Sequence, residues 1–289
     1  MRVFAAALLL ALAMPAVQAA EPKLAAVAAE NFYGDIARQI GGDRVEVKSI
    51  ISSPDQDPHL FETSPGIVRA VADARLVIFN GADYDAWVDK LLKAAPRPDR
   101  VIINVASVAK RKAGDNPHLW YDPTVMRLSA RAIAAALTKI DSAHGSDVAT
   151  RLAAYEASLK PIDDKIAALR AKYAGTPVTA SEPVFGYMAS ALGFTMRNER
   201  LQLAVMNDTE PSARDIAAFE QDLKKRAVHL MFYNKQAGSK LVQRLVEVAR
   251  ASKVPVVGVT ETMPPDTNFQ NWMLRQLDDV EKALREAAP

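Results

Sequence analysis

Short runs of β-branched residues alternate with longer alanine-rich stretches through most of this 289-residue sequence. In the first half, "VEVKSII" and "RLVIFNG" are separated by "TSPGIVRAVADA", in which the apolar residues have a helical spacing. The same alternation resumes after Gly175 and continues through "PVVGVTET". Alternation of this kind is typical of βα units that form a parallel sheet. The sequence therefore predicts an α/β fold with two lobes of mainly parallel sheet.

A long helical stretch is expected between the two lobes, over residues 146–174. It is rich in alanine, leucine, lysine and acidic residues, and it contains no glycine. A helix of this length would span roughly 40 Å, which exceeds what a connection inside one small lobe requires. Pro161 is expected to kink or break it, because proline lacks the N–H that a helix interior uses. The predicted organisation is an N-terminal lobe at 20–145, this linking helix, and a C-terminal lobe at 175–289.

Residues 1–19 resemble a cleaved secretory signal. A basic start at Arg2 is followed by an apolar run, a breaker at Pro15 and small residues before Ala20. The run is shorter than the roughly 20 residues that span a bilayer, and this length argues against the alternative of an uncleaved anchor. With no cysteine, the chain can form no disulfide, thiolate metal site or lipid-carrying cysteine. We therefore expect a periplasmic protein. A net charge of +2 gives no reason to expect nucleic-acid binding.

Two of the four histidines share one local pattern, Pro-His-Leu. His59 lies in "DPHLFE" and His118 lies in "NPHLWYDP". The preceding proline favours extended backbone, and we expect each histidine to lie where a strand ends. Since the loops beyond the carboxyl ends of parallel strands form the ligand face of such a lobe, both imidazoles are expected to point into one cleft. The alternative for each is a loop histidine that only hydrogen-bonds the backbone.

Two glutamates in the second half occupy the same kind of position. Glu182 follows the predicted strand "PVTAS", and Glu261 follows the apolar run "PVVGV". Imidazole and carboxylate together suit zinc and manganese. The spacing between the four residues matches no local metal motif, so other roles stay open for the two glutamates. Glu182 could instead cap a helix, and Glu261 could be a solvated loop acid.

Five segments together resemble the periplasmic metal-binding proteins of ABC importers for zinc and manganese. These segments are "DPHLFETSPGIVRAVADARLVIFNGADYDAWVDKLL", "NPHLWYDP", "SEPVFGYMA", "EPSARDIAAF" and the end of "PVVGVTET". The resemblance implies two lobes joined by a rigid helix, with one metal ion in the cleft between them. It also implies a monomer that delivers the ion to a membrane permease and is not an enzyme.

The resemblance also assigns the metal ligands. It places His59 and His118 as the two histidine ligands and Glu182 as the third ligand, where members of this family have histidine or glutamate. Glu261 occupies the position of the family's usual aspartate. Asp57 and Asp122 are candidates either to orient the imidazoles or to cap helices. Tyr233 and Asn234 are expected to line the cleft.

Alternatives remain for the identity of the metal ion and for the function of the protein. Glu182 and the absence of the histidine-rich loop of many zinc-specific members favour manganese, while the same four ligands also accept zinc. A rival function is a zinc hydrolase, in which two histidines and one glutamate hold the metal and the other carboxylate acts as general base. Neither a His-Glu-x-x-His helix nor a Gly-x-Ser-x-Gly turn is present. A surface adhesin of the same fold is disfavoured by the lack of a lipid-anchoring cysteine.

Overall fold

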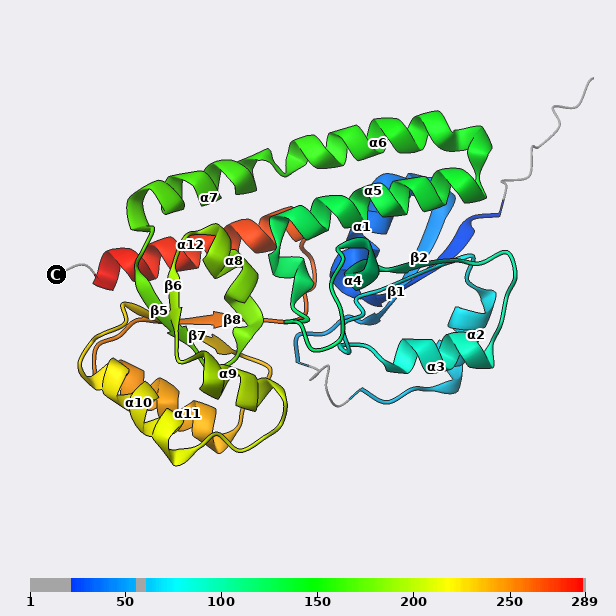
Figure 1. Ribbon diagram of the computed structural model, residues 1–289. Coiled ribbons are helices and arrows are strands. Elements are labelled where there is room, and N and C mark those ends of the chain that lie inside the picture. The colour runs from blue at the N-terminus through cyan, green and yellow to red at the C-terminus, as the bar shows by residue number, and fades with distance from the viewer. Residues whose placement is uncertain (1–21, 56–60, 288–289) are drawn as a thin grey trace, which may run out of the picture.

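The computed structural model describes residues 22–55 and 61–287, so the predicted signal at 1–19 lies outside the described residues. Two α/β lobes lie at opposite ends of an elongated molecule and are connected along one side by helices (Figure 1). This arrangement confirms the predicted α/β class with two lobes. Within the described residues, no helix is both long enough and apolar enough to cross a membrane.

The N-terminal lobe is a four-stranded parallel sheet of order β2-β1-β3-β4 with helices packed around it. Its strands are β1 (Leu24–Glu30), β2 (Val45–Ile51), β3 (Leu76–Phe79) and β4 (Val101–Asn104). Its helices are α1 (Asn31–Gly41), α2 (Pro65–Asp73), α3 (Trp87–Ala94), α4 (Val105–Val108) and α5 (Pro123–Ile140), with 3₁₀ turns η1 (Gly42–Arg44), η3 (Leu119–Tyr121) and η4 (Ser142–His144). The central strand β3 is buried along its whole length, as expected for a strand covered on both faces.

The C-terminal lobe repeats this topology with a second four-stranded parallel sheet, of order β6-β5-β7-β8. Its strands are β5 (Pro177–Ala180), β6 (Thr195–Arg197), β7 (Leu230–Asn234) and β8 (Val256–Val259). Its helices are α8 (Gly186–Ala191), α9 (Glu199–Met206), α10 (Ala213–Lys224), α11 (Lys240–Ala251) and α12 (Phe269–Ala287), with the 3₁₀ turn η5 (Pro183–Phe185). In both sheets the first strand of the lobe is central, which brings the loops after neighbouring strands together at one edge.

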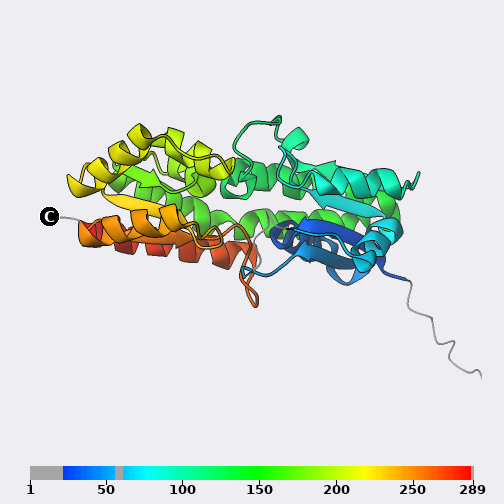
Figure 2. The ribbon, with the colours of Figure 1, turned by 90° about the horizontal axis from the view of Figure 1, so that it is seen from below.

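Two helices, α6 (Gly145–Ser158) and α7 (Lys160–Tyr173), make the long connection between the lobes. They meet at Leu159, and Pro161 lies in the first turn of α7, where its missing N–H costs nothing. The predicted break at this proline is confirmed. Helix α6 packs on α5 and α1, and α7 packs on α12, so the connection lies along both lobes (Figures 1 and 2).

The largest hydrophobic core cluster continues from one lobe into the other, and each lobe has a smaller cluster of its own. Aromatic rings form the central part of the largest cluster, where Tyr121 of the N-terminal lobe meets Phe185 of the C-terminal lobe with ring centroids 5.0 Å apart. Phe185 in turn stacks on Phe232 of β7 at 4.7 Å. Because Tyr121 and Phe185 follow directly on the loops that carry the candidate ligands, this packing fixes the two halves of the site relative to each other.

Candidate metal centre

His118 belongs to the loop that joins α4 to η3, and its side chain is fully buried. The expectation that it directly follows a strand is wrong, because β4 ends at Asn104 and α4 comes between. The loop is held by neighbouring polar groups instead. The Asn80 side-chain amide donates a hydrogen bond to the Pro117 carbonyl at 2.8 Å, and the same carbonyl accepts from the Leu119 N–H at 2.7 Å. These bonds fix the backbone on both sides of the imidazole.

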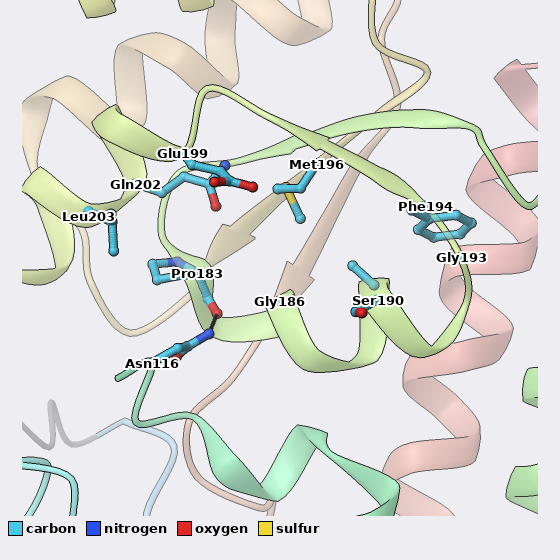
Figure 3. A pocket seen from close by; sticks show the side chains of 11 residues that line it. Asn116, Pro183, Gly186, Ser190, Gly193, Phe194, Met196, Glu199, Gln202 and Leu203 are labelled. Carbon is cyan, nitrogen blue, oxygen red and sulfur yellow. Dashed lines mark hydrogen bonds between the residues drawn. The ribbon is translucent and has the colours of Figure 1, made fainter. Parts of the chain in front are cut away.

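Asn116 determines which nitrogen of His118 faces the site. Its Nδ2 donates to the Pro183 carbonyl at 2.8 Å (Figure 3), and its Oδ1 faces His118. That oxygen lies 2.7 Å from His118 Nδ1 and 3.1 Å from the His118 backbone nitrogen. The Nδ1 therefore carries the hydrogen, and Nε2 keeps the lone pair that a metal ion requires.

Glu182 lies two residues beyond the end of β5, as the sequence predicts. Its backbone is extended, with φ of −155°, and its side chain makes no capping hydrogen bond to the following 3₁₀ turn. Glu182 therefore occupies the position that precedes the turn, but its carboxylate is directed elsewhere. The carboxylate turns inward, where its Oε2 accepts from the Nδ2 of Asn234 at 2.8 Å. Only 3% of the residue is exposed.

Glu261 lies two residues beyond β8 and is 1% exposed, so the alternative of a solvated loop acid is also wrong. The side chain of Gln236 holds its backbone. Gln236 Oε1 accepts from the Glu261 N–H at 2.6 Å and from the Thr262 N–H at 3.1 Å. The carboxylate Oε1 accepts from Asn234 Nδ2 at 2.5 Å, while Oε2 lies 3.6 Å from His118 Nε2.

His118, Glu182 and Glu261 each offer one ligand atom, and these atoms all lie within 4.8 Å of one another. The structure thus brings together three of the four predicted ligands. His59, and with it Asp57, lies outside the described residues. The other two histidines are not part of this group: His144 contacts Asp141 at 3.0 Å, and His229 is exposed before β7.

The charge of Glu261 affects two tyrosines of the N-terminal lobe. Burial raises the pKa of Tyr84 well above its ordinary value, and the negative charges of Glu261 and Glu30 raise it further. Burial also raises the pKa of Tyr121, again with a smaller contribution from Glu261. Both hydroxyls therefore stay protonated and act as neutral groups beside the carboxylates. The Tyr84 ring lies edge-on to the His118 imidazole, with centroids 6.3 Å apart.

Two buried carboxylates this close together repel each other, and taking them out of water is costly unless a cation compensates. A divalent ion placed among the three ligand atoms would supply that compensation. One imidazole nitrogen and two carboxylate oxygens form a donor set that suits zinc or manganese. Within the described residues, this is the only group of three or more such side chains that could hold a metal ion.

Several residues that position the ligands could not be identified from the sequence. Asn116 and Gln236 are polar residues close in sequence to His118 and Asn234, and the motif "NPH" contained the signal for Asn116. Asp122, which was a candidate to orient an imidazole, instead caps α5 by accepting from the Thr124 N–H at 2.9 Å. Asn234 lines the site as predicted. Tyr233 instead packs against the second hydrophobic cluster of the C-terminal lobe.

A surface cavity of about 430 Å³ lies on the C-terminal lobe next to this site. Asn116 and Pro183 form one end of it, and Figure 3 shows the hydrogen bond between them there. The remaining walls come from α8, β6 and α9. Gly186 is also part of the wall, and a Cβ atom added to it would lie 3.0 Å from Asn116 Nδ2.

Comparison with known proteins decides between the functions that such a site allows. Residues 26–283 match the family ZnuA, described as "Zinc-uptake complex component A periplasmic". The chain belongs to this family. The zinc-binding protein TroA of Treponema pallidum is 26% identical over 246 residues, covering 81% of this chain and 77% of the relative. The manganese ABC transporter substrate-binding lipoprotein PsaA of Streptococcus mitis is 23% identical over 290 residues, covering 91% and 89%.

Solved structures show the same fold. The periplasmic zinc-binding protein TroA from Treponema pallidum superposes with a TM-score of 0.77 at 20% identity, covering 91% of this chain and 99% of that chain. A manganese-bound periplasmic metal-binding protein from Candidatus Liberibacter asiaticus gives 0.71 at 18% identity, covering 91% and 100%. The protein is a metal-binding solute-binding component of an ABC importer for zinc or manganese. It is not an enzyme, and the zinc-hydrolase alternative is wrong.

Proposed function

We propose that this protein captures one divalent ion, Zn²⁺ or Mn²⁺, with His59, His118, Glu182 and Glu261. The observation that carries the proposal is the meeting of three of these side chains, from both lobes, within 4.8 Å in a buried site. Two imidazoles and two carboxylates give four protein donors, which leaves no easy position for an activated water. Such a closed site suits binding and transport of the ion rather than chemistry on it.

The same proposal includes where the protein works and what receives the ion. Residues 1–19 have the features of an export signal, and the family description places its members in the periplasm. The protein acts there as a monomer and passes its ion to the membrane permease of an ABC importer. The relatives' names support both candidate ions, since TroA is named for zinc and PsaA for manganese.

Calorimetric titration of metal-stripped protein with Zn²⁺ and Mn²⁺ tests the ligand set. Each of His59→Ala, His118→Ala, Glu182→Ala and Glu261→Ala should weaken binding by at least about tenfold, because each removes a donor atom. The matched control is His229→Ala, which removes an exposed imidazole outside the site and should leave the affinity unchanged. Wild-type affinity in any one of the four variants would remove that residue from the ligand set, and a wild type that binds neither ion would refute the proposal.

A further inference from the structure

Asn234, at the end of β7, has an orientation that its surroundings determine. The residue is 2% exposed, and its Oδ1 accepts a hydrogen bond from the Gln236 backbone N–H at 3.0 Å. A backbone N–H requires an acceptor, so the oxygen of this amide must point toward Gln236. The Nδ2 group consequently points the other way, toward the two carboxylates.

Both hydrogens of that Nδ2 group are used on candidate metal ligands. One is donated to Glu182 Oε2 at 2.8 Å and the other to Glu261 Oε1 at 2.5 Å. Hydrogen bonds to ionised carboxylates are stronger than bonds between neutral groups, particularly in a buried site. A single amide therefore holds one oxygen of each carboxylate and limits the rotation of both.

This arrangement determines how many oxygens the carboxylates can give to an ion. A bidentate carboxylate must turn both oxygens toward the metal, whereas these two groups each have one oxygen held by Asn234. With one oxygen from each carboxylate and the His118 imidazole, the described residues supply three donors, and the proposed ligand His59 would bring the number to four. Four-coordinate tetrahedral geometry is characteristic of zinc, while manganese favours six-coordinate sites rich in oxygen.

We propose that Asn234 restricts Glu182 and Glu261 to one donor oxygen each and thereby raises the affinity for zinc relative to manganese. Asn234 is a positioning residue that acts through the carboxylates and does not touch the ion. The inference rests on the proposed function, since it assumes that both glutamates bind the ion. It opposes the preference for manganese that Glu182 would otherwise give the site.

Competition titrations of Zn²⁺ against Mn²⁺ test the proposal with Asn234→Leu, which keeps the branched shape of the side chain, and Asn234→Ala, which leaves room for rotation. Both variants lack the donor, so the ratio of zinc to manganese affinity should fall by about tenfold. The matched control is Asn271→Leu, at an exposed position of α12, where the ratio should stay at the wild-type value. A ratio within threefold of wild type in both Asn234 variants would overturn the proposal.

X-ray absorption spectroscopy of the wild-type protein gives an independent readout that needs no variant to fold. The zinc-loaded protein should show four donor atoms at zinc–ligand bond lengths of about 2.0–2.2 Å, with no second carboxylate oxygen from either glutamate. Bidentate carboxylates in the wild type would overturn the proposal whatever the variants do. A wild type that binds neither ion would instead refute the proposed function, so the two failures are distinguishable.

Discussion

Glu30 and Asp85 form a buried pair of carboxyl groups in the N-terminal lobe, and each residue is 1% exposed. Asp85 accepts hydrogen bonds from the backbone N–H groups of Asn80 at 2.5 Å and Gly81 at 2.8 Å, so it is the member better suited to carry the charge. Burial raises the pKa of Asp85 to about 6. Burial also raises the pKa of Glu30 well above its ordinary value, and the charge of Asp85 raises it further.

The sign of the resulting pH effect follows from the direction of the shift. A carboxyl whose pKa is raised in the folded state holds its proton more tightly there than in the unfolded chain. Its stabilising contribution is therefore complete below about pH 4 and is lost as the pH rises through about 6. For Asp85, a rise from 3.8 to about 6 corresponds to about 3 kcal/mol of unfolding free energy. That is a substantial part of the roughly 5–15 kcal/mol that stabilises a typical domain.

Asp85→Asn tests this pH effect, because an amide does not titrate and its one oxygen can still accept from one of the two backbone N–H groups. Urea unfolding of metal-free protein at pH 4 and pH 7 gives the stability of each protein at both values. As the pH rises from 4 to 7, the unfolding free energy of the variant should increase by about 3 kcal/mol relative to that of wild type. Because each protein is compared with itself at two pH values, any loss of stability that does not depend on pH cancels.

The control for this experiment is Asp99→Asn, at an exposed site where a hydrogen bond from Arg97 lowers the pKa of the aspartate. Its effect should have the opposite sign, since a lowered pKa stabilises the fold at higher pH and the contribution is lost on acidification. Parallel stability curves for wild type and Asp85→Asn would show that burial does not raise the pKa of Asp85.

Three further changes have defined outcomes. Asn116→Ala should weaken metal binding by about 10- to 100-fold in titrations, because His118 loses the acceptor that fixes its Nδ1–H. Gly186→Ala should weaken metal binding less than Asn116→Ala does, because the added Cβ would lie 3.0 Å from Asn116 Nδ2 and displace this side chain without removing its contact with His118. If the metal affinity is unchanged in both variants, Asn116 does not have this role. Glu182→His should raise the ratio of zinc to manganese affinity in competition titrations, because it replaces a hard oxygen donor with an imidazole, and an unchanged ratio would place Glu182 outside the coordination sphere.

The fold and the candidate ligands could be predicted from sequence because each depends on local patterns. The alternation of strand and helix signals predicted the two sheets, and Glu182 and Glu261 were found because each directly follows a strand. The position of His118 was less predictable, since helix α4 is only four residues long and gives little periodicity. The hydrogen bonds around the ligands were not predictable. Asn234 lies 52 residues from Glu182 and 27 from Glu261, and no sequence pattern encodes that distance.

Side chains of the N-terminal lobe bind the backbone of the C-terminal lobe beside each of its two candidate ligands. The bonds run from Asn116 Nδ2 to the Pro183 carbonyl at 2.8 Å, from the Tyr121 hydroxyl to the Thr260 carbonyl at 2.9 Å, and from Asn31 Nδ2 to the Met263 carbonyl at 2.6 Å. Pro183 is next to Glu182, and Thr260 is next to Glu261. The same residues that set the distance between the lobes therefore set the distance between the ligands.

This coupling has a consequence for how an ion would be held and released. If the lobes moved apart as rigid bodies, these three hydrogen bonds would break together with the Tyr121–Phe185 ring contact and other bonds between the lobes, such as that from Tyr187 to the Asn116 carbonyl. Hydrogen bonds to buried groups cost about 1–3 kcal/mol each when a partner is lost, so wide opening is unfavourable for the isolated protein. Release of the ion then requires either a small local movement of the ligand loops or a partner whose binding compensates for the broken contacts. In the proposed function a membrane permease receives the ion, and its binding is then the candidate source of that compensation.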